Sequence, residues 1–405
     1  MHWKLLAVVA GAACISACGR VPVATAFRVV DSSGVSIASS SAPHWKPGEG
    51  WRVDSLPLLD IGGAEGPPQA QFTEIAATLL LPDRGVLVAE GADATLRFFD
   101  SAGTAVRTVG RKGEGPGEYQ SFGDLRRAGD SLLVWDDQLR RLSVLSLDGE
   151  YVRGLPMRFE AGRYSFRRLA GRWVNGELLF SATNGVSNRL PIGVVRDTVA
   201  LFRVRSDGVR DSLLGRWPWS ETMAVTGAHF VSVLAVPYQT HGTMHSSDSG
   251  FWIGTADGPA IDYYTNEGRL ARSIRWAATP VPVASGELTV WRQQELAQFK
   301  ATKDEVTESF RSASVKARFP AVRPPYRTFL VTAEGELLVE RVARWDAAGF
   351  AGMCDIFARD GRWLGPVALP VGAMPWAVRG DRLLAGWNDA DGVGHVRVYR
   401  LVRRP

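Results

Sequence analysis

Residues 110–125 read GRKGEGPGEYQSFGDL, a glycine-rich loop between two runs of strand-forming residues. Such a loop cradles phosphate when it leads from a strand into a helix N-terminus, whose amide groups and dipole face the anion. Here the loop leads from a strand into a strand, Pro116 lacks an amide donor, and no G-K-[ST] sequence follows. The stretch is therefore predicted to connect two repeated units rather than to bind phosphate.

An earlier segment has the same pattern. Residues 61–75 (IGGAEGPPQAQFTEI) and 109–125 both place Gly after a β residue, then E-G-P, then Phe-x-acid-aliphatic. Strand-like runs follow each segment, and the equivalent residues Val86 and Leu132 lie 46 positions apart. Internal repeats of this length determine the whole architecture of a chain.

The strand pattern recurs in six units. Their characteristic strands are VLVAE (86–90), LLVWD (132–136), ELLFSA (177–182), GFWIGTA (250–256), GELLVERV (335–342) and DRLLAGW (381–387). The turns SAG, DGE, SDG, NEG and RDG stand at corresponding places in five of them,. Repeats of about 45 residues built from four strands are typical of β-propellers. We therefore predict an all-β, six-bladed β-propeller of four-stranded antiparallel blades over residues 51–402.

The two ends of this range complement each other. The sixth unit reaches Val402 without an outer strand, whereas WRVDSLPLLDIG (51–62) is a strand with no unit of its own. We predict that this N-terminal strand completes the last blade, which closes the ring and removes an open sheet edge.

The N-terminus has the features of a secretory signal: Lys4, an apolar stretch from Leu5 to Ala13, and small residues before Cys18,. The apolar run is too short to span a membrane. The I-S-A-C tetrapeptide at 15–18 resembles the lipobox of bacterial lipoproteins, which implies cleavage after residue 17 and lipid on Cys18; an ordinary signal cut at another small residue is the alternative. Residues 18–50 are rich in Ser, Ala, Gly and Pro and are predicted to be a flexible tether, with a short strand possible at Phe27–Val30.

The lipobox, the six units, the GEGPGEY motif at 113–119 and the closing strand together resemble bacterial six-bladed propeller lipoproteins related to NHL-repeat and TolB-like propellers. This resemblance covers roughly residues 51–402. It implies location in the cell envelope, with the lipid holding the chain to a bacterial membrane, most naturally the outer membrane on its periplasmic or surface side. Because these families include binding proteins, lyases and lactonases, it implies a fold more than an activity.

Composition excludes several classes of protein. Maturation would leave Cys18 and Cys354, so no disulfide framework is expected, and Cys354 is expected to be a buried, inert thiol,. The net charge of +5 comes from scattered arginines rather than a basic block. Nucleic-acid binding is therefore not expected.

Residues 285–318 interrupt the strand pattern. Leu288, Trp291 and Phe299 recur at helical spacing, and so do Val306, Phe310 and Ala313,. We predict two short amphipathic helices inserted between blades 4 and 5. Their apolar faces either pack on the propeller rim or form a lid or partner-docking element.

An aromatic residue stands near the start of the first strand in every blade: Phe72, Phe122, Phe166, Tyr238, Tyr326 and Trp376. Two positions further on stand Glu74, Asp124, Arg168, Thr240, Thr328 and Val378, and Arg327 adjoins Tyr326. Because first strands surround the central channel, Glu74, Asp124, Arg168, Thr240, His241 and Arg327 are candidates for a pocket at the channel mouth. Alternatively, the aromatic residues wedge between blades and the polar residues face solvent.

Metal binding has weak candidates. His241 and His245 have a spacing that joins two imidazoles only on a helix, whereas Gly242 and the surrounding Thr and Ser indicate a loop,. Glu74 and Asp124 could supply oxygen ligands to a divalent cation such as Ca²⁺, an arrangement similar to that of propeller lactonases. No G-x-S-x-G motif indicates a nucleophile,.

Three functions follow as hypotheses. The favoured one is a binding module for a small molecule, glycan, peptide or partner protein at the channel mouth. The alternatives are a metal-dependent, lactonase-like hydrolase or lyase, and a structural subunit of an envelope complex.

Overall fold

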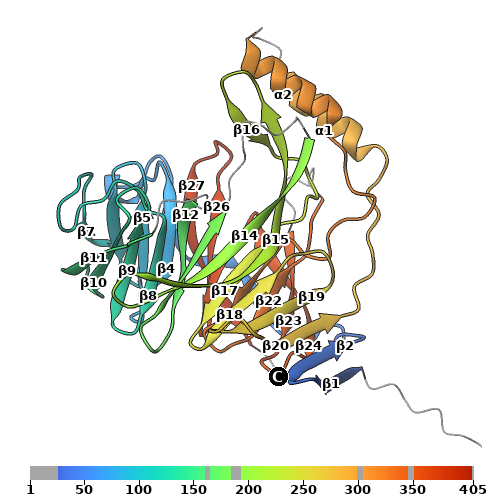
Figure 1. Cartoon of the computed structure of the whole chain (residues 1–405), viewed down its shortest axis with the longest axis horizontal. Helices are drawn as coiled ribbons and strands as arrows, with labels where there is room; N and C mark the ends of the chain where they lie inside the picture. Colours follow the sequence, from blue (N-terminus) through green and yellow to red (C-terminus); the bar gives the residue numbers. More distant parts are fainter. Residues whose placement is uncertain (1–25, 160–164, 184–192, 299–303, 345–350, 404–405) are drawn as a thin grey trace, which may run out of the picture.

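The computed structural model describes residues 26–159, 165–183, 193–298, 304–344 and 351–403 (Figure 1). These residues form six β-sheets and two α-helices, which confirms the predicted all-β class. The predicted signal residues 1–17 and Cys18 lie outside the described residues, so cleavage and lipid attachment remain predictions. Among the described residues, no helix is long and apolar enough to cross a membrane.

The sheets follow one another along the chain. The first holds β4 (Ile75–Leu80), β5 (Val86–Glu90), β6 (Thr95–Phe99) and β7 (Ala105–Val109), and the second β8 (Asp124–Ala128), β9 (Ser131–Asp136), β10 (Arg141–Ser146) and β11 (Tyr151–Pro156). The third holds β12 (Ser165–Arg172), β13 (Leu178–Thr183), β14 (Gly193–Val204), β15 (Arg210–Thr226) and β16 (Val231–Leu234).

The fourth sheet holds β17 (Thr243–Ser247), β18 (Gly250–Gly254), β19 (Ala260–Thr265) and β20 (Leu270–Trp276), joined by β2 (Val35–Ser40) and β1 (Phe27–Ser32). The fifth holds β21 (Thr328–Val331), β22 (Leu337–Glu340), β23 (Ala351–Phe357) and β24 (Trp363–Val371). The sixth holds β25 (Met374–Arg379), β26 (Arg382–Asn388), β27 (Gly394–Val402) and β3 (Arg52–Gly62).

The five repeated turns have one geometry. Their glycines are Gly103, Gly149, Gly208, Gly268 and Gly361, with φ between 78° and 88°. Each glycine amide donates to the carbonyl three residues earlier, at 2.8 to 3.1 Å. Only glycine adopts this left-handed conformation without steric cost, which explains why the same turn residue recurs in each unit.

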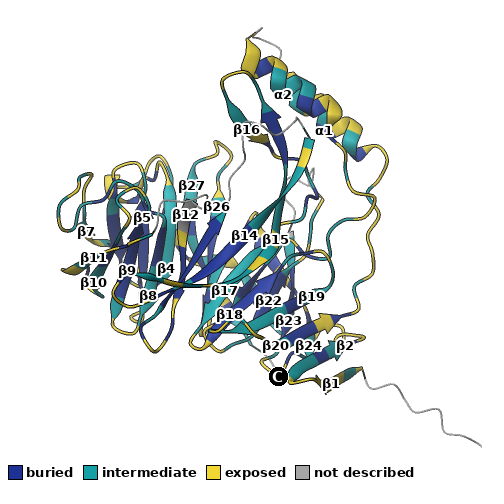
Figure 2. Cartoon of the chain, viewed as in Figure 1, coloured by how far each residue is buried: buried dark blue, intermediate teal, exposed yellow. Residues whose placement is uncertain are grey.

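The sheets pack face to face in a cycle. The first strands contact one another in the order β4, β8, β12, β17, β21, β25 and back to β4. A separate apolar cluster fills each junction between neighbouring sheets. Buried residues accordingly run along the strands while exposed ones gather in the turns (Figure 2). This is the arrangement of a β-propeller.

The N-terminal strand β3 is the outer strand of the sixth sheet. It pairs antiparallel with β27, with Arg52 opposite Val402 and Ile61 opposite Val396. Ile61 is 2% exposed and packs in the cluster between the sixth and first sheets.

Residues 27–40, within the segment 18–50 predicted to be a flexible tether, form two strands, the first of which includes the short strand considered at Phe27–Val30. β1 and β2 form a hairpin, and β2 pairs in parallel with β20. Ala38 is fully buried against the fifth sheet, and the Trp45 amide donates to the Leu364 carbonyl at 2.7 Å. The high serine content of this stretch concealed its strand alternation, which places Ala38 and Ser40 on a buried face.

The glycine-rich stretch 110–125 connects β7 to β8, as predicted. Glu118 accepts hydrogen bonds from the Gly115 amide at 2.8 Å and from Arg111 Nε at 2.8 Å. Arg141 donates to the Glu114 carbonyl at 2.7 Å, and the Tyr119 ring is fully buried. Its polar groups are therefore satisfied within the loop and by Arg141 of β10, while Tyr119 packs in the apolar cluster between the first two sheets.

The predicted helices are present as α1 (Glu287–Gln298) and α2 (Glu305–Lys316). Trp291 and Ala313 are buried against Met223 and Val225 of β15. The helices therefore pack on the projecting β15–β16 hairpin of the third sheet rather than directly on the fourth and fifth sheets that they separate in sequence (Figure 1). Phe299 lies outside the described residues.

Candidate functional site

The predicted mouth residues lie at or near the starts of the first strands. Glu74 precedes β4, Asp124 begins β8, Arg168 lies within β12, Thr240 and His241 precede β17, and Arg327 precedes β21. The cyclic contact of these strands brings this end of the sheets around one centre. Two of these residues are held by separate ion-pair partners, Asp124 by Arg126 and Arg327 by Glu340.

The two acids are engaged separately. The Glu74 amide donates to Glu90 Oε1 at 2.9 Å, while its own carboxylate is exposed. Asp124 forms an ion pair with Arg126 at 3.1 Å. Neither arrangement brings the two carboxylates to a shared ligand.

Thr240, His241 and Arg327 do come together, around Glu221 of β15. The Thr240 amide donates to Glu221 Oε2 at 3.2 Å, and the Glu221 amide donates to the Thr240 carbonyl at 2.9 Å. His241 retains exposed surface, but the protein around it partly desolvates the ring, and this together with the Arg327 charge lowers its pKa despite the opposing effect of Glu221. Arg327 itself is paired with Glu340 through Nε at 2.9 Å.

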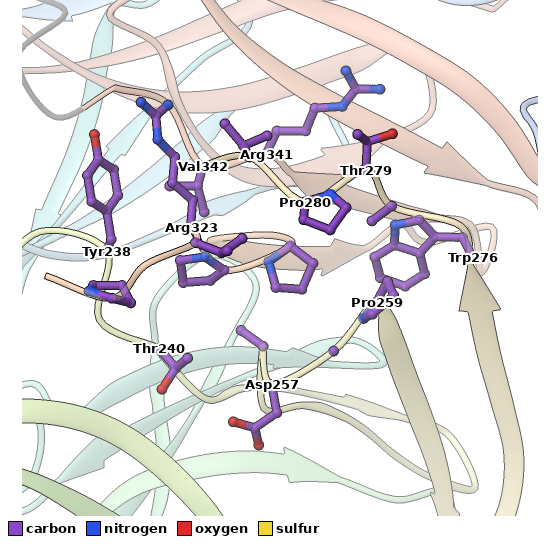
Figure 3. Close-up of a pocket in the computed structure, with 18 of the residues that line it drawn as sticks. Tyr238, Thr240, Asp257, Pro259, Trp276, Thr279, Pro280, Arg323, Arg341 and Val342 are labelled. Atoms are coloured by element: carbon purple, nitrogen blue, oxygen red, sulfur yellow. The ribbon is translucent and has the colours of Figure 1, made fainter. Parts of the chain in front are cut away.

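A cavity of about 640 Å³ adjoins this group, between the fourth and fifth sheets (Figure 3). Its walls come from the starts of β17 and β21, from the β18–β19 and β22–β23 connections, and from the segments leading into and out of the helices. Its lining is Glu221, Tyr238, Thr240, Ala256, Asp257, Gly258, Pro259, Trp276, Ala277, Ala278, Thr279, Pro280, Val281, Pro320, Val322, Arg323, Pro324, Pro325, Arg341, Val342, Asp355 and Trp363. The size is that of a site for a small organic molecule.

Tyr326 fixes the wall that the fourth sheet contributes. Its hydroxyl accepts from the Ala256 amide at 3.0 Å and donates to the Ala260 carbonyl at 3.1 Å. The ring is 1% exposed and packs against Trp276 with centroids 5.7 Å apart. This aromatic residue therefore wedges between two sheets, as one of the two sequence interpretations predicted.

On the fifth-sheet side, Asp355 holds two lining residues in place. Arg341 donates to both of its carboxylate oxygens at 2.7 Å, and Trp363 Nε1 donates at 2.9 Å. Asp355 is 5% exposed, whereas the Arg341 side chain is 43% exposed. A buried carboxylate thus orients a guanidinium whose outer edge reaches the cavity.

On the helix side, Glu287 plays the corresponding part. It accepts from the Ala284 amide at 2.8 Å, from Arg323 at 3.2 Å and from the Tyr238 hydroxyl. Arg323 also lies over the Tyr238 ring, 4.8 Å from its centroid. Burial alone would raise the pKa of Glu287, but the hydrogen bonds from Tyr238 and Ala284 and the charge of Arg323 outweigh it and lower the pKa.

Apart from Glu221, the charged residues that line the cavity are matched in ion pairs. Arg341 pairs with Asp355, Arg323 with Glu287, and Asp257 with Arg196 of β14. Between them lie proline rings and valine side chains. The cavity offers fixed donors and acceptors on apolar walls without a large excess of either charge.

The metal candidates are not assembled into a centre. Among the described residues, no three His, Cys, Asp or Glu side chains lie together so as to hold a metal ion. His245 of β17 lies against Phe329, with ring centroids 5.3 Å apart. Burial, the charge of Arg126 and, more weakly, that of Arg168 lower its pKa to about 4, so the ring is neutral at physiological pH.

Sequence reasoning missed most of the cavity. Thr240 and Tyr238 had been singled out, but Arg341, Asp355 and Trp276 had not. The available signal was the proline-rich stretch 320–325, which marks where the chain leaves the helices and must take an irregular path,. Cys354, next to Asp355, is buried with a raised pKa, as expected of an inert thiol,.

Comparisons with known proteins support the fold alone. No protein-family model and no curated protein sequence matches the chain. A member of the DUF4221 family from Bacteroides vulgatus superposes with a TM-score of 0.50 at 9% identity, covering 88% of this chain and 99% of that one. A Bacteroides fragilis protein named as an exported protein gives 0.48 at 12% identity (91% and 100% covered), and a virginiamycin B lyase from Staphylococcus aureus gives 0.40 at 10% identity (86% and 99% covered). The chain is similar in fold to propeller-type proteins.

Proposed function

We propose that this chain is a binding protein of the bacterial cell envelope whose cavity between the fourth and fifth sheets takes a small, uncharged organic molecule. The observation that carries the proposal is the cavity of about 640 Å³, in which both lining arginines already have carboxylate partners and Glu221 accepts a backbone hydrogen bond. The binding region lies beside the predicted mouth residues Thr240, His241 and Arg327 rather than on the channel axis.

Charge pairing favours a neutral ligand. A carboxylate entering the cavity would lose its hydration, while Arg341 and Arg323 already have carboxylate partners,. A neutral molecule with an apolar body loses less hydration and can accept from the exposed edge of Arg341 and donate to Glu221. The Thr240 hydroxyl oxygen, buried and without a hydrogen-bond partner among the described residues, is a further polar atom at this wall.

The proposal extends to the scaffold and its location. The six sheets are proposed to be the blades of a six-bladed propeller that β3 closes, supported by the cyclic strand contacts and the β3–β27 pairing. Export and attachment of lipid at Cys18 are proposed from the signal-like residues 1–17 and the I-S-A-C tetrapeptide,.

A matched ligand pair tests the proposal. Indole-3-acetamide and indole-3-acetate share one apolar body and differ in charge. We expect the amide to raise the melting temperature of the mature chain and the acetate to raise it much less, because ligand binding to the folded state stabilises by mass action. Isothermal titration calorimetry measures both affinities directly.

Two variants locate the effect. Arg341→Gln removes the paired guanidinium at the cavity and should weaken amide binding, whereas Arg153→Gln, exposed on β11, should not. Tighter binding of the acetate, or equal binding in Arg341→Gln and the parent, contradicts a neutral ligand in this cavity.

A further inference from the structure

A row of directly paired residues crosses the three outer strands of the fourth sheet. Arg28 of β1 stands opposite Ser39 of β2, and Ser39 stands opposite Arg275 of β20. Side chains of paired residues point to the same face of a sheet, and neighbouring strands lie about 4.8 Å apart, so the two arginines flank the serine at about 10 Å between Cα atoms.

This row lines a second hollow, next to the larger cavity. A cavity of about 450 Å³ is bounded by Arg28, Arg275, Ser39 and the neighbouring Ser40 and Ser41, and it shares Trp276 and Ala277 with the larger cavity. Both arginines are exposed, and Arg275 Nε donates to Ser273 Oγ at 3.1 Å. Two guanidinium groups and a hydroxyl that line one hollow are the kinds of donor that bind a phosphate group,.

The surrounding charges leave the row basic. Asp262 of β19 faces the same side, since it pairs in register with Ser273, and it interacts with Arg275. Arg28 has no counterpart of this kind on its own strand pair, because its partner is Ser39. Val30, two residues further along β1 on the same face, is 49% exposed,.

The opposite face of these strands is occupied. Ala38, Ile274 and Trp276 pack in the cluster between the fourth and fifth sheets. The arginine row therefore belongs to the outward face, at the corner of the molecule from which the chain continues toward its N-terminus (Figure 1). Seven residues separate Ala26 from Cys18, and even fully extended this stretch reaches at most about 29 Å.

We propose that the Arg28–Ser39–Arg275 row binds the phosphate groups of anionic phospholipids in the membrane that carries the chain. The choice of a membrane over a soluble phosphate compound rests on the proposed lipid at Cys18, which would keep this corner at the bilayer surface. Val30 adds an apolar contact at the same surface. Binding here would hold the β1–β2 hairpin against the membrane, with α1 and α2 far from this hairpin (Figure 1).

Vesicle binding of the unlipidated chain tests the row independently of the anchor. The mature chain with Cys18→Ser retains every described residue. We expect it to bind phosphatidylcholine vesicles containing phosphatidylglycerol and not vesicles of phosphatidylcholine alone. Arg28→Gln with Arg275→Gln should weaken binding about 30-fold, because each arginine near an anionic surface contributes about fivefold. Raising the ionic strength should weaken it further.

A matched double variant provides the control. Arg153→Gln with Arg400→Gln removes two exposed strand arginines away from the row and should leave vesicle binding unchanged. Equal losses in both double variants would overturn the proposal in favour of net charge alone. If the row binds inorganic phosphate through these arginines but the chain shows no preference for anionic vesicles, the phosphate ligand does not come from membrane phospholipids and the proposal is overturned.

Two further readouts separate this inference from the proposed function. Indole-3-acetamide affinity should be unchanged in the row variant, since Arg28 and Arg275 do not line the larger cavity. Lipid on Cys18 is measured by mass spectrometry of the full-length chain produced in bacteria. If Cys18 carries lipid but the unlipidated chain does not bind anionic vesicles, the phospholipid site at the arginine row is refuted and the lipid anchor at Cys18 is supported.

Discussion

Removing the carboxylate of Glu287 should release the helical insertion without unfolding the sheets. In Glu287→Ala, Arg323 loses its ion-pair partner, and the Tyr238 hydroxyl and Ala284 amide lose their acceptor. The Glu287 and Arg323 side chains are only 5% and 12% exposed. Breaking a buried pair of this kind costs about 3 kcal/mol, which corresponds to a change on the order of 100-fold in the local opening equilibrium.

Hydrogen exchange resolves where that free energy is lost. Amides of α1 and α2 should exchange on the order of 100-fold faster, because this network acts together with one apolar cluster and the hydrogen bond from the Ala228 amide to Glu305 to hold the helices, while amides of β22 and β26 should be unaffected,. Glu308→Ala on α2 is the matched control. Its carboxylate is 66% exposed and pairs with Arg311 on the surface, so its loss should cost under about 1 kcal/mol,.

The same network should respond to acid. Because the pKa of Glu287 is lowered on folding from 4.5, its stabilisation is fully present above about pH 4.5 and is lost as the pH falls through the folded value,. Helix exchange, corrected for intrinsic rates, should therefore accelerate in the parent below pH 4.5 and not in Glu287→Ala. Equal acceleration in both proteins, or equal effects of the two substitutions at neutral pH, would refute the role given to Glu287.

Three further predictions test the scaffold. Tyr326→Phe leaves the Ala256 amide and the Ala260 carbonyl unpaired, and urea unfolding should show a loss of about 1–3 kcal/mol of unfolding free energy,. Tyr151 is exposed, so the control Tyr151→Phe should change the unfolding free energy very little. Ile61→Ala on β3 should lower the unfolding free energy by about 2–5 kcal/mol,. Leu56 on the same strand is 79% exposed, and a loss in Ile61→Ala no greater than that in Leu56→Ala would contradict closure of the sixth sheet by β3. The pKa of His245 is lowered on folding, so the stability that its neutral imidazole contributes is lost as the pH falls from 6.5 to about 4,. NMR should therefore find this imidazole neutral at pH 5.5. A His245 that titrates near 6.5 would refute the lowered pKa.

The architecture could be predicted because the repeats encode it locally. Each turn requires glycine at a left-handed position, and that requirement fixed the spacing of strands in five units. The unpaired run at 51–62 likewise indicated where the chain ends would meet, and β3 lies beside β27. Such patterns follow from local requirements of the backbone, so they can be recognised in a single sequence.

The cavity could not be predicted because its residues become neighbours only through tertiary contacts. Arg341 and Asp355 lie on the two sides of the β22–β23 connection, and nothing in their spacing indicates that they pair. The second strand of this segment, β2, was not predicted for a related reason: its serines are typical of linkers, while the Ala38 position is buried only because the fifth sheet covers it. Alternation of small residues was too weak a signal of a strand.

The pairing of β3 with β27 also bears on when the molecule can fold. Arg52 of β3 pairs with Val402 of β27, so the last sheet joins segments from nearly opposite ends of the polypeptide. Contacts so distant in sequence carry a large loop-closure entropy and slow the folding reaction. Because a chain is synthesised from its N-terminus, β3 emerges unpaired, and the cycle of sheets is completed only when the final strands have been made. Until then the exposed edge of β3 is open to chaperones and to other unfinished chains.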